Sequence, residues 1–319
     1  MAVQAGRTGM MTPSFVPPAP VRRLRDLTRA RAVFTQERSR HKQRAEKLLE
    51  DAQIKLTTVA TDAFGVPGRA MMDAMTAGRR DPRELARLAK GRMTTKYDAL
   101  VEALTGNFND HHGYLLKVFL DTIDHLSAQI ADLDREIETA IAELPGPDNA
   151  GSGTARGPGI IECLDAIPGV GPHTAQILLA ELGPDMRAFP TADHLTSWAK
   201  LCPRTVQSGA KNGAGRTGKG NPWLKALGEA AMTAARTDTF LGARYRRLVK
   251  HMGHAKALVA VARSILVIAW HLIDDPDAAY HDLGADWHQR HLDPARKTRD
   301  LVRQLERLGH QVTLVPTAA

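Results

Sequence analysis

A glycine-rich, basic segment near the middle of the chain holds the residues whose types best suit chemistry. Residues 207–221 contain three cations and no acid, and they contain five glycines: Lys211, Arg216 and Lys219, with Gly209, Gly213, Gly215, Gly218 and Gly220. Glycine lets backbone amides approach a ligand closely, and amides together with cations suit a phosphate group. Ser208 stands at the entrance of the segment, where its hydroxyl could attack a phosphoryl group whose charge the cations stabilise. A Ser-Gly pair is also common in turns, so residue type alone favours a plain turn.

The end of this segment predicts the start of a helix. Asn221 is a good N-cap and Pro222 fits a first helical turn, so we expect a helix from Trp223. Residues 213–219 match most of the phosphate loop of nucleotide hydrolases, but Gly220 follows where a Ser or Thr would hold magnesium. No buried parallel strand is expected before it, so the sequence argues against an ATPase.

A second motif, in residues 160–182, has the pattern of a helix-hairpin-helix. Two short apolar-faced helices flank Gly169, Val170 and Gly171. The glycines permit a tight turn and leave backbone N–H groups open at the start of the second helix, where a DNA phosphate oxygen can bind. Such contacts position a protein on a duplex without reading its sequence. A helical hairpin that serves only packing stays open as the alternative.

A third motif, in residues 240–273, joins a basic strip to an apolar helix. Arg244, Arg246, Arg247 and Lys250 predict a second nucleic-acid face. The apolar stretch 257–273 is interrupted by two polar residues and is short for a membrane span, so we expect a buried helix. Two histidine pairs, His251 with His254 and His288 with His291, have no acid or thiol at useful spacing, so no metal site is predicted there.

The N-terminal part predicts a long helical hairpin or coiled coil. A basic helix is expected over 21–63, with one apolar stripe formed by Leu24, Leu27, Ala30 and Phe34. It either lies along a phosphate backbone or presents a solvated face. Shorter helices are expected over 71–75, 82–90 and 97–104.

Residues 119–144 carry apolar side chains alternately four and three apart, as in the seam of a coiled coil: Phe119, Ile123, Leu126, Ile130, Leu133, Ile137, Ala140 and Leu144. Such a seam needs a partner to cover it. A second copy of the chain or the basic helix folding back would each serve. We expect a homodimer or a higher oligomer through this segment.

The sequence therefore predicts a mainly α fold with a helical region followed by a compact helical domain. The predicted parts are a flexible leader 1–20, the helical region 21–144, a Gly- and Pro-rich linker 145–159, the compact domain 160–273 and a tail 274–319. The tail should hold a helix over 294–308 and a short strand in 310–316.

Composition limits the partners and the compartment. The formal charge of +8 indicates a polyanionic partner, because surplus Arg and Lys bind phosphates in a salt-dependent manner. A merely soluble basic protein is the alternative. Cys163 and Cys202 lack the spacing of a zinc site and are expected as small buried residues in a reducing cytosol. Residues 1–21 lack the apolar core of a signal peptide, so a cytoplasmic location is predicted.

The three motifs in this order, with residues 15–49 and the ending from 282, resemble the bridge-RNA-guided insertion-sequence transposases, also called Asp-Glu-Asp-Asp transposases (the IS-one-ten family). The resemblance covers nearly everything from Phe15 onward. It implies that Ser208, in the Gln-Ser-Gly motif, is the nucleophile that attacks a DNA phosphodiester. It also implies DNA and a guide RNA as partners.

One part of the family pattern is not found in this sequence. The family has an acidic nuclease-like domain in front, whose four acids hold divalent metal, whereas the first acid here is Asp26. We therefore expect an incomplete copy that is inactive alone, with no cofactor of its own and Mg²⁺ only in an intact relative. The alternative is a non-catalytic nucleic-acid-binding protein or a dimerising regulator of transposition. A purely structural coiled-coil protein would leave the glycine-rich loop without a role.

Overall fold

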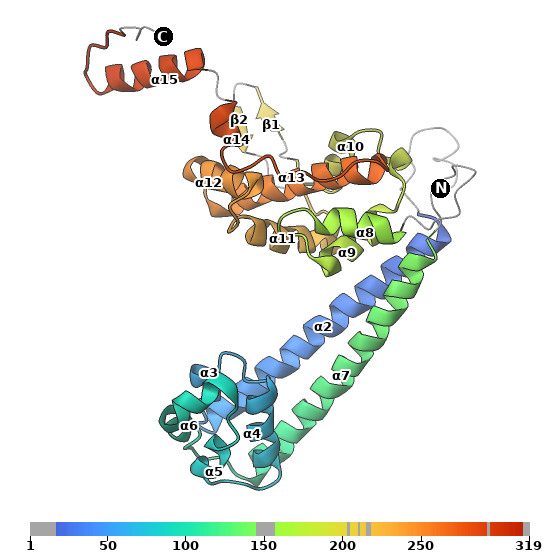
Figure 1. Cartoon of the computed structure of the whole chain (residues 1–319), viewed down its shortest axis with the longest axis vertical. Coiled ribbons are helices and arrows are strands. Elements are labelled where there is room, and N and C mark those ends of the chain that lie inside the picture. The colour runs from blue at the N-terminus through green and yellow to red at the C-terminus, as the bar shows by residue number, and fades with distance from the viewer. Residues whose placement is uncertain are drawn as a thin grey trace. The chain divides into compact units, whose positions relative to one another are not determined.

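The computed structural model describes residues 17–144, 157–202, 205–209, 211–214, 218–291 and 294–314. It is mainly α, as predicted, and the chain divides into two compact units (Figure 1). We call Arg23–Ala140 the N-terminal unit, and Met1–Arg22 together with Ile141–Ala319 the C-terminal unit.

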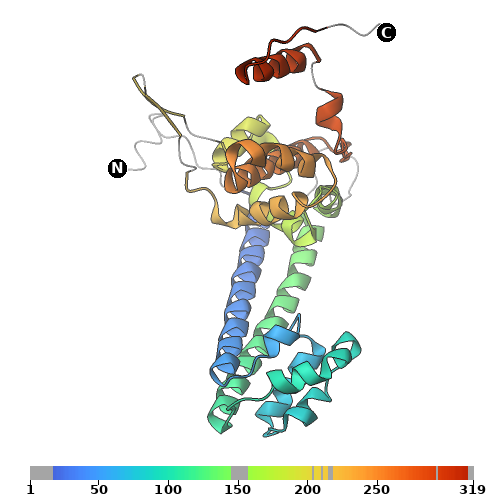
Figure 2. The ribbon, with the colours of Figure 1, turned by 90° about the vertical axis from the view of Figure 1, so that its left-hand side faces the viewer.

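Two long helices of the N-terminal unit lie side by side and antiparallel, α2 (Ala19–Asp51) and α7 (Asp110–Ala142), as both views show (Figures 1 and 2). Arg31 Nη1 donates to Asp134 Oδ1 at 2.9 Å, and the rings of His41 and Phe119 lie 6.1 Å apart. The apolar seam of α7 is thus covered by the basic helix of the same chain, which is one of the two partners that the sequence left open. Pairing with a second copy stays a prediction.

Most residues of the seam predicted on α7 are buried, whereas three of the four residues of the stripe predicted on α2 are half-buried, and the coiled coil itself stays a prediction. The buried seam residues of α7 are Ile123, Leu126, Ile130, Ile137 and Ala140, while Phe119 and Leu133 are half-buried, and Leu144, which is buried, lies beyond the end of the helix. On α2 the buried residues are Val21, Leu24, Thr28, Arg31, Ala45 and Leu49, while the other members of the predicted stripe are half-buried. Arg31 can lie on the buried side because its alkyl stem packs while its guanidinium reaches a carboxylate.

The predicted long helix also ends earlier than expected. It stops at Asp51, and Gln53 takes a positive φ of 63° before the next helix begins. The elements that follow are α3 (Leu56–Val59), α4 (Val66–Thr76), α5 (Pro82–Ala86), η1 (Gly91–Lys96) and α6 (Tyr97–Ala103). They enclose a small core with three methionines at its centre, Met71, Met72 and Met75. The predicted short helices are confirmed in place, although their ends differ.

The C-terminal unit is built around α13 (His254–Asp274). Its other elements are α8 (Gly157–Asp165), α9 (Pro172–Leu182), η2 (Met186–Ala188), α10 (Ala192–Trp198), β1 (Thr205–Ser208), β2 (Lys211–Ala214), η3 (Pro222–Lys225), α11 (Ala226–Ala234), α12 (Phe240–Met252), α14 (Trp287–Arg290) and α15 (Pro294–Arg307). Helix α13 contacts α8, α10, α11 and α12. By length and composition α13 is the one described helix that could cross a membrane, but eight of its residues are buried, as in a core helix.

Three expectations for this unit need correction. An antiparallel strand pair, β1 with β2, occupies the first part of the segment predicted as a glycine-rich loop, and Figure 2 shows it extending away from the helices. The described part of the predicted strand in the tail, 310–314, has no regular structure, whereas the tail helix is confirmed as α15. Cys163 and Cys202 are half-buried rather than buried, and both are free thiols.

The predicted leader and linker fall largely outside the described residues. Residues 1–16 and 145–156 are not described, so their predicted character is untested. Helix α2 begins at Ala19, inside the predicted leader, and α8 begins at Gly157, inside the predicted linker.

Candidate nucleic-acid interface

The turn between α8 and α9 is fixed against the rest of the C-terminal unit. Gly169 has a φ of +89°, and a Cβ there would lie 2.2 Å from the carbonyl oxygen of Ala230 on α11. The N–H of Val170 donates to the carbonyl oxygen of Ile167 at 2.9 Å, and the Val170 side chain is buried. Gly169 and Val170 therefore serve packing in this structure, which is the alternative that the sequence left open. Their binding to nucleic acid stays a prediction.

Gly171 differs from its neighbours because it faces open space. A Cβ at Gly171 would meet no atom within 4 Å. The residue is the N-cap of α9, followed by Pro172, and no side chain caps this end of the helix. Since the first N–H groups of a helix favour an anion, Gly171 marks the part of the turn that stays suited to a phosphate.

Ser208 is the last residue of β1, beside the turn of the strand pair. In the antiparallel register Ser208 lies opposite Lys211, and Gly209 between them has a φ of +59°. The backbone thus brings the predicted nucleophile and the first predicted cation of the segment to opposite positions. The side chains of Ser208 and Lys211, and the whole of Arg216, lie outside the described residues.

The far end of the same segment is held by hydrogen bonds. Asn221 Oδ1 accepts from the N–H of Trp223 at 3.0 Å, which confirms its predicted capping role, here for η3. Its Nδ2 donates at 2.6 Å to Oε2 of Glu181, which is 1% exposed. Both polar atoms of Asn221 thus have structural partners, and its binding to nucleic acid stays a prediction.

A largely apolar cavity of about 760 Å³ lies beside this anchored end. Lys219, which is exposed, lines it together with apolar side chains of η3, α11 and α13, such as Leu224, Met232 and Val259. Gly220 fits closely here, because a Cβ would lie 2.4 Å from the carbonyl oxygen of Ala199. Of the predicted cations in the glycine-rich segment, Lys219 is the one whose side chain is described.

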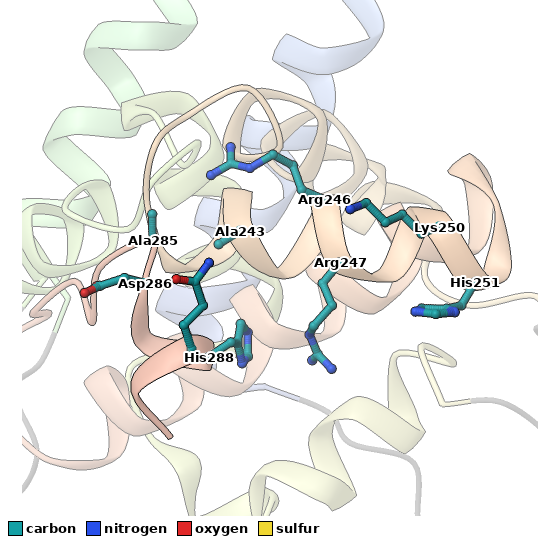
Figure 3. Close-up of a pocket in the computed structure, with 9 residues that line it drawn as sticks. Ala243, Arg246, Arg247, Lys250, His251, Ala285, Asp286 and His288 are labelled. Carbon is teal, nitrogen blue, oxygen red and sulfur yellow. The ribbon is translucent and has the colours of Figure 1, made fainter. Parts of the chain in front are cut away.

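The basic strip on α12 forms one wall of a separate cavity of about 520 Å³ (Figure 3). The lining residues come from α12 and from the region of α14: Ala243, Arg246, Arg247, Lys250 and His251, with Ala285, Asp286, His288 and Gln289. Aromatic contacts hold α14 against the start of α12, since the ring of Phe240 lies 5.3 Å from that of Trp287 and 5.0 Å from that of His288. The sequence predicted the cations of this wall but not the cavity.

The four predicted cations of α12 differ in their surroundings. Arg246 is engaged within the unit, because it donates to the carbonyl oxygen of Thr237 and to Asp238 Oδ1, both at 3.0 Å. Arg247 and Lys250 are exposed on the cavity wall. Arg244 is half-buried, and its pKa is lowered first by burial and then by the charges of Arg247 and Arg263.

The histidines set aside by the sequence analysis have different roles. His251 and His288 line the cavity of α12, whereas Nδ1 of His254 lies 2.7 Å from the hydroxyl of Tyr245. The pKa of His288 is lowered, first by burial and then by the charges of Arg247, Arg244 and His291. Within the described parts of the chain, no group of three or more His, Cys, Asp or Glu could hold a metal ion. The prediction that this chain has no metal site of its own stays a prediction.

Comparison with known proteins places most of these features in one family segment. The family model described as "Transposase IS116/IS110/IS902 family" matches residues 161–246, from α8 to the middle of α12, including Ser208. Residues 169–171 and the glycine-rich segment also lie inside the match. The later part of the α12 cavity lies beyond it.

Three relatives carry insertion-element or transposase names. "Insertion element IS110 uncharacterized 43.6 kDa protein" of Streptomyces coelicolor is 35% identical over 115 residues, which is 35% of this chain and 28% of that protein. "Probable family 20 transposase" of Pseudomonas aeruginosa is 31% identical over 116 residues, 36% of this chain and 30% of the other. "Mini-circle putative transposase for IS117" of Streptomyces coelicolor is 29% identical over 202 residues, 63% of this chain and 45% of the other.

The chain spans less than half the length of each of these relatives, from 28% to 45%. The family model and the relatives nevertheless carry the same kind of name, that of an insertion-element transposase. Residues 161–246 are therefore similar to the transposase domain of the IS116/IS110/IS902 family.

Proposed function

We propose that this chain acts on DNA as part of an insertion-sequence transposase, with Ser208 as the nucleophile. The observation that supports the proposal is the family match over residues 161–246, which contains the α8–α9 turn, Ser208 and the first cations of α12 in one segment. The open N-terminal end of α9 at Gly171 offers a place for a backbone phosphate. Residues 169–171 would then position the duplex, and Ser208 would act on one strand.

The proposed reaction is a transesterification. The Ser208 hydroxyl oxygen attacks the phosphorus of a DNA phosphodiester, and the bond from phosphorus to one DNA oxygen breaks. The serine proton passes to solvent and the leaving DNA oxygen takes up a proton, so a phosphoserine link and a free DNA hydroxyl result. The link conserves the bond energy, and the reverse attack rejoins a strand.

Cations of the glycine-rich segment would stabilise the charge that builds on the phosphoryl oxygens. We assign this role to Lys211, Arg216 and Lys219, because preorganised cations lower the free energy of such a transition state. The resemblance to the family also implies Mg²⁺ held by four acids. The described residues do not supply such a set, and no step above passes through that ion.

We further propose that the partners include RNA and a second copy of the chain. The formal charge of +8 suits two polyanions, and the resemblance implies a guide RNA in which base pairing selects the target. A dimer or higher oligomer would bring two sites to two DNA ends. These assignments rest on the resemblance and on charge.

The test is a covalent adduct between the protein and DNA. The full chain would be combined with a full-length relative whose own motif serine is replaced by alanine, so that the acids implied by the resemblance are present. The complex would be incubated with Mg²⁺, with a labelled duplex spanning the ends of the element, and with RNA transcribed from the flanking DNA. We expect an adduct that survives denaturation, and we expect Ser208→Ala to abolish it while changing the Kd for the duplex less than about twofold. Ser197→Ala, at an exposed serine on α10, is the matched control and should keep the adduct.

Two outcomes would contradict the proposal. An adduct that persists in Ser208→Ala would exclude this serine as the nucleophile. Tight binding by the unchanged chain without any adduct would favour the non-catalytic nucleic-acid-binding alternative.

A further inference from the structure

The cavity between α12 and α14 carries more positive charge than the structure balances. Three cations line it, Arg246, Arg247 and Lys250, against one carboxylate, Asp286. Asp286 Oδ2 pairs with Arg290 Nε at 3.0 Å, and Arg246 pairs with Asp238 at 3.0 Å. Among the residues that the structure describes, no carboxylate pairs with Arg247 or Lys250.

The layer behind the cavity adds to this imbalance. Arg244 precedes Arg247 by one helical turn, and the charge of Arg263 on α13 acts on Arg244. Arg263 has a partner, since its Nη2 lies 2.7 Å from Asp193 Oδ1. Arg244 Nε is buried and has no hydrogen-bond partner, and the same holds for Nε2 of His288. Two buried nitrogen atoms without partners, beside several cations, carry a free-energy cost that a bound anion would reduce.

Arg247 and Lys250 both line the cavity from α12. Arg247 and Lys250 lie three residues apart on α12 and so are neighbours on one helical face. In Figure 3 Arg247 and His288 extend to the same side of α12. Gln289, which is exposed on the opposite wall, adds an amide donor. This combination of a guanidinium, an ammonium and an amide matches the oxygens of a phosphate.

We propose that the α12–α14 cavity is a phosphate site that takes one backbone phosphodiester of a bound nucleic acid, with Arg247 and Lys250 as its direct ligands. The half-buried Arg244, one helical turn before Arg247, adds positive charge, and the ring of His288 lines the site. The cavity of about 520 Å³ leaves room for the sugars on either side of the phosphate. The choice of a nucleic acid as the occupant rests on the proposed function, whereas the phosphate chemistry follows from the cavity itself.

The first experiment measures duplex binding by the full chain. Fluorescence anisotropy with a labelled 20-base-pair DNA would compare the unchanged protein, the double variant Arg247→Gln/Lys250→Gln, and the control Lys297→Gln/Arg303→Gln. The control removes the same charge from exposed residues of α15. We expect the cavity variant to bind about tenfold more weakly than the control near 0.1 M salt, with a salt dependence reduced by about one phosphate contact. Circular dichroism would confirm that all variants keep their helix content.

The second experiment tests the cavity without any nucleic acid. Inorganic pyrophosphate would be titrated into the full chain while the His288 ring signal is followed by nuclear magnetic resonance. We expect a saturable shift in the unchanged protein and in the control, and none in the cavity variant. No shift in the unchanged protein would overturn the phosphate site.

The outcomes separate the two proposals. Equal DNA affinities of the cavity variant and the control would overturn the nucleic-acid assignment, and a pyrophosphate shift would then identify a site for free phosphate compounds. Absence of any DNA adduct of the unchanged chain, with the effect of the cavity variant preserved, would overturn the proposed chemistry alone. An adduct that forms normally in a cavity variant of unchanged affinity would overturn the inference alone.

Discussion

His288 reports on the charge of the α12–α14 cavity. Its pKa lies below the ordinary value of 6.5, first because of burial and then because of Arg247, Arg244 and His291. Arg247→Gln removes the largest of the charge contributions, so we expect the pKa of His288 to rise. It should stay below 6.5, because burial remains. A pH titration of the ring Cε1–H signal, assigned with His288→Gln, measures it.

Arg246→Gln is the matched control for this prediction. Arg246 lines the same cavity, but it is not among the groups that lower the pKa of His288. An equal rise in both variants would show that general charge, and not Arg247, sets the pKa. The lowered pKa also affects stability, because the unfolded chain binds a proton at His288 more readily than the folded chain does. Protonation of His288 should therefore lower the free energy of unfolding as the pH falls below 6.5.

Residue roles were predictable from the sequence where they depend on neighbours along the chain. The N-cap of Asn221 was predicted, because capping needs only the next two residues. Its bond to Glu181, 40 residues away, has no local signal. The placement of His288 beside α12 likewise depends on the packing of α14 against Phe240. The burial of Arg31 on α2 was equally unpredictable, because its ion-pair partner, Asp134, lies far away in the sequence.

At the scale of elements, two glycines of the α8–α9 turn have different roles, since Gly169 packs against α11 and Gly171 faces open space. Gly169→Ala places a Cβ 2.2 Å from the Ala230 carbonyl oxygen at a φ of +89°, so both a clash and backbone strain arise. We expect a loss of at least about 2 kcal/mol in the free energy of unfolding, seen as a lower midpoint in urea. Gly171→Ala, where a Cβ meets open space at a φ of −94°, should cost less than about 1 kcal/mol. Equal losses in the two variants would mean that the turn does not dock on α11 as described.

The strand pair and the end of α2 were not predicted, because their sequences lack the usual patterns of a strand and of a helix end. The β1–β2 pair, Thr205–Ser208 with Lys211–Ala214, has no alternation of apolar and polar residues, so a glycine-rich composition was taken for an irregular loop. Helix α2 ends at Asp51 without a glycine or proline, and Gln53 at positive φ makes the break. By contrast, α13 and the seam of α7 follow from apolar periodicity, which is the most dependable signal in a helical protein.

At the scale of the whole molecule, the positive charge of the chain is distributed unevenly. In the N-terminal unit, arginines pair with acids of α7: Arg23 with Glu136, Arg31 with Asp134, and Arg69 with Asp124. Charges used in this way add little to phosphate binding. In the C-terminal unit, Arg247 and Lys250 have no such partner among the described residues. The phosphate-binding role is therefore assigned to the unit that carries the family match, and the choice between a phosphate-binding and a solvated face of α2 stays open.

The assembly of the molecule can be tested at the seam of α7. Ile130 is 8% exposed in the packing of the N-terminal unit, where α2 of the same chain covers α7. If this hairpin forms within each chain, Ile130→Asp buries a charge inside every copy and should lower the free energy of unfolding by about 3 kcal/mol or more. Circular dichroism against temperature would show an earlier loss of helix that does not depend on protein concentration. Val118→Asp, on the same helix at a residue that is 43% exposed, should change little. A seam that instead joins two copies would give a different result. Ile130→Asp would then sediment as a folded monomer, and the melting temperature of the unchanged protein would rise with protein concentration.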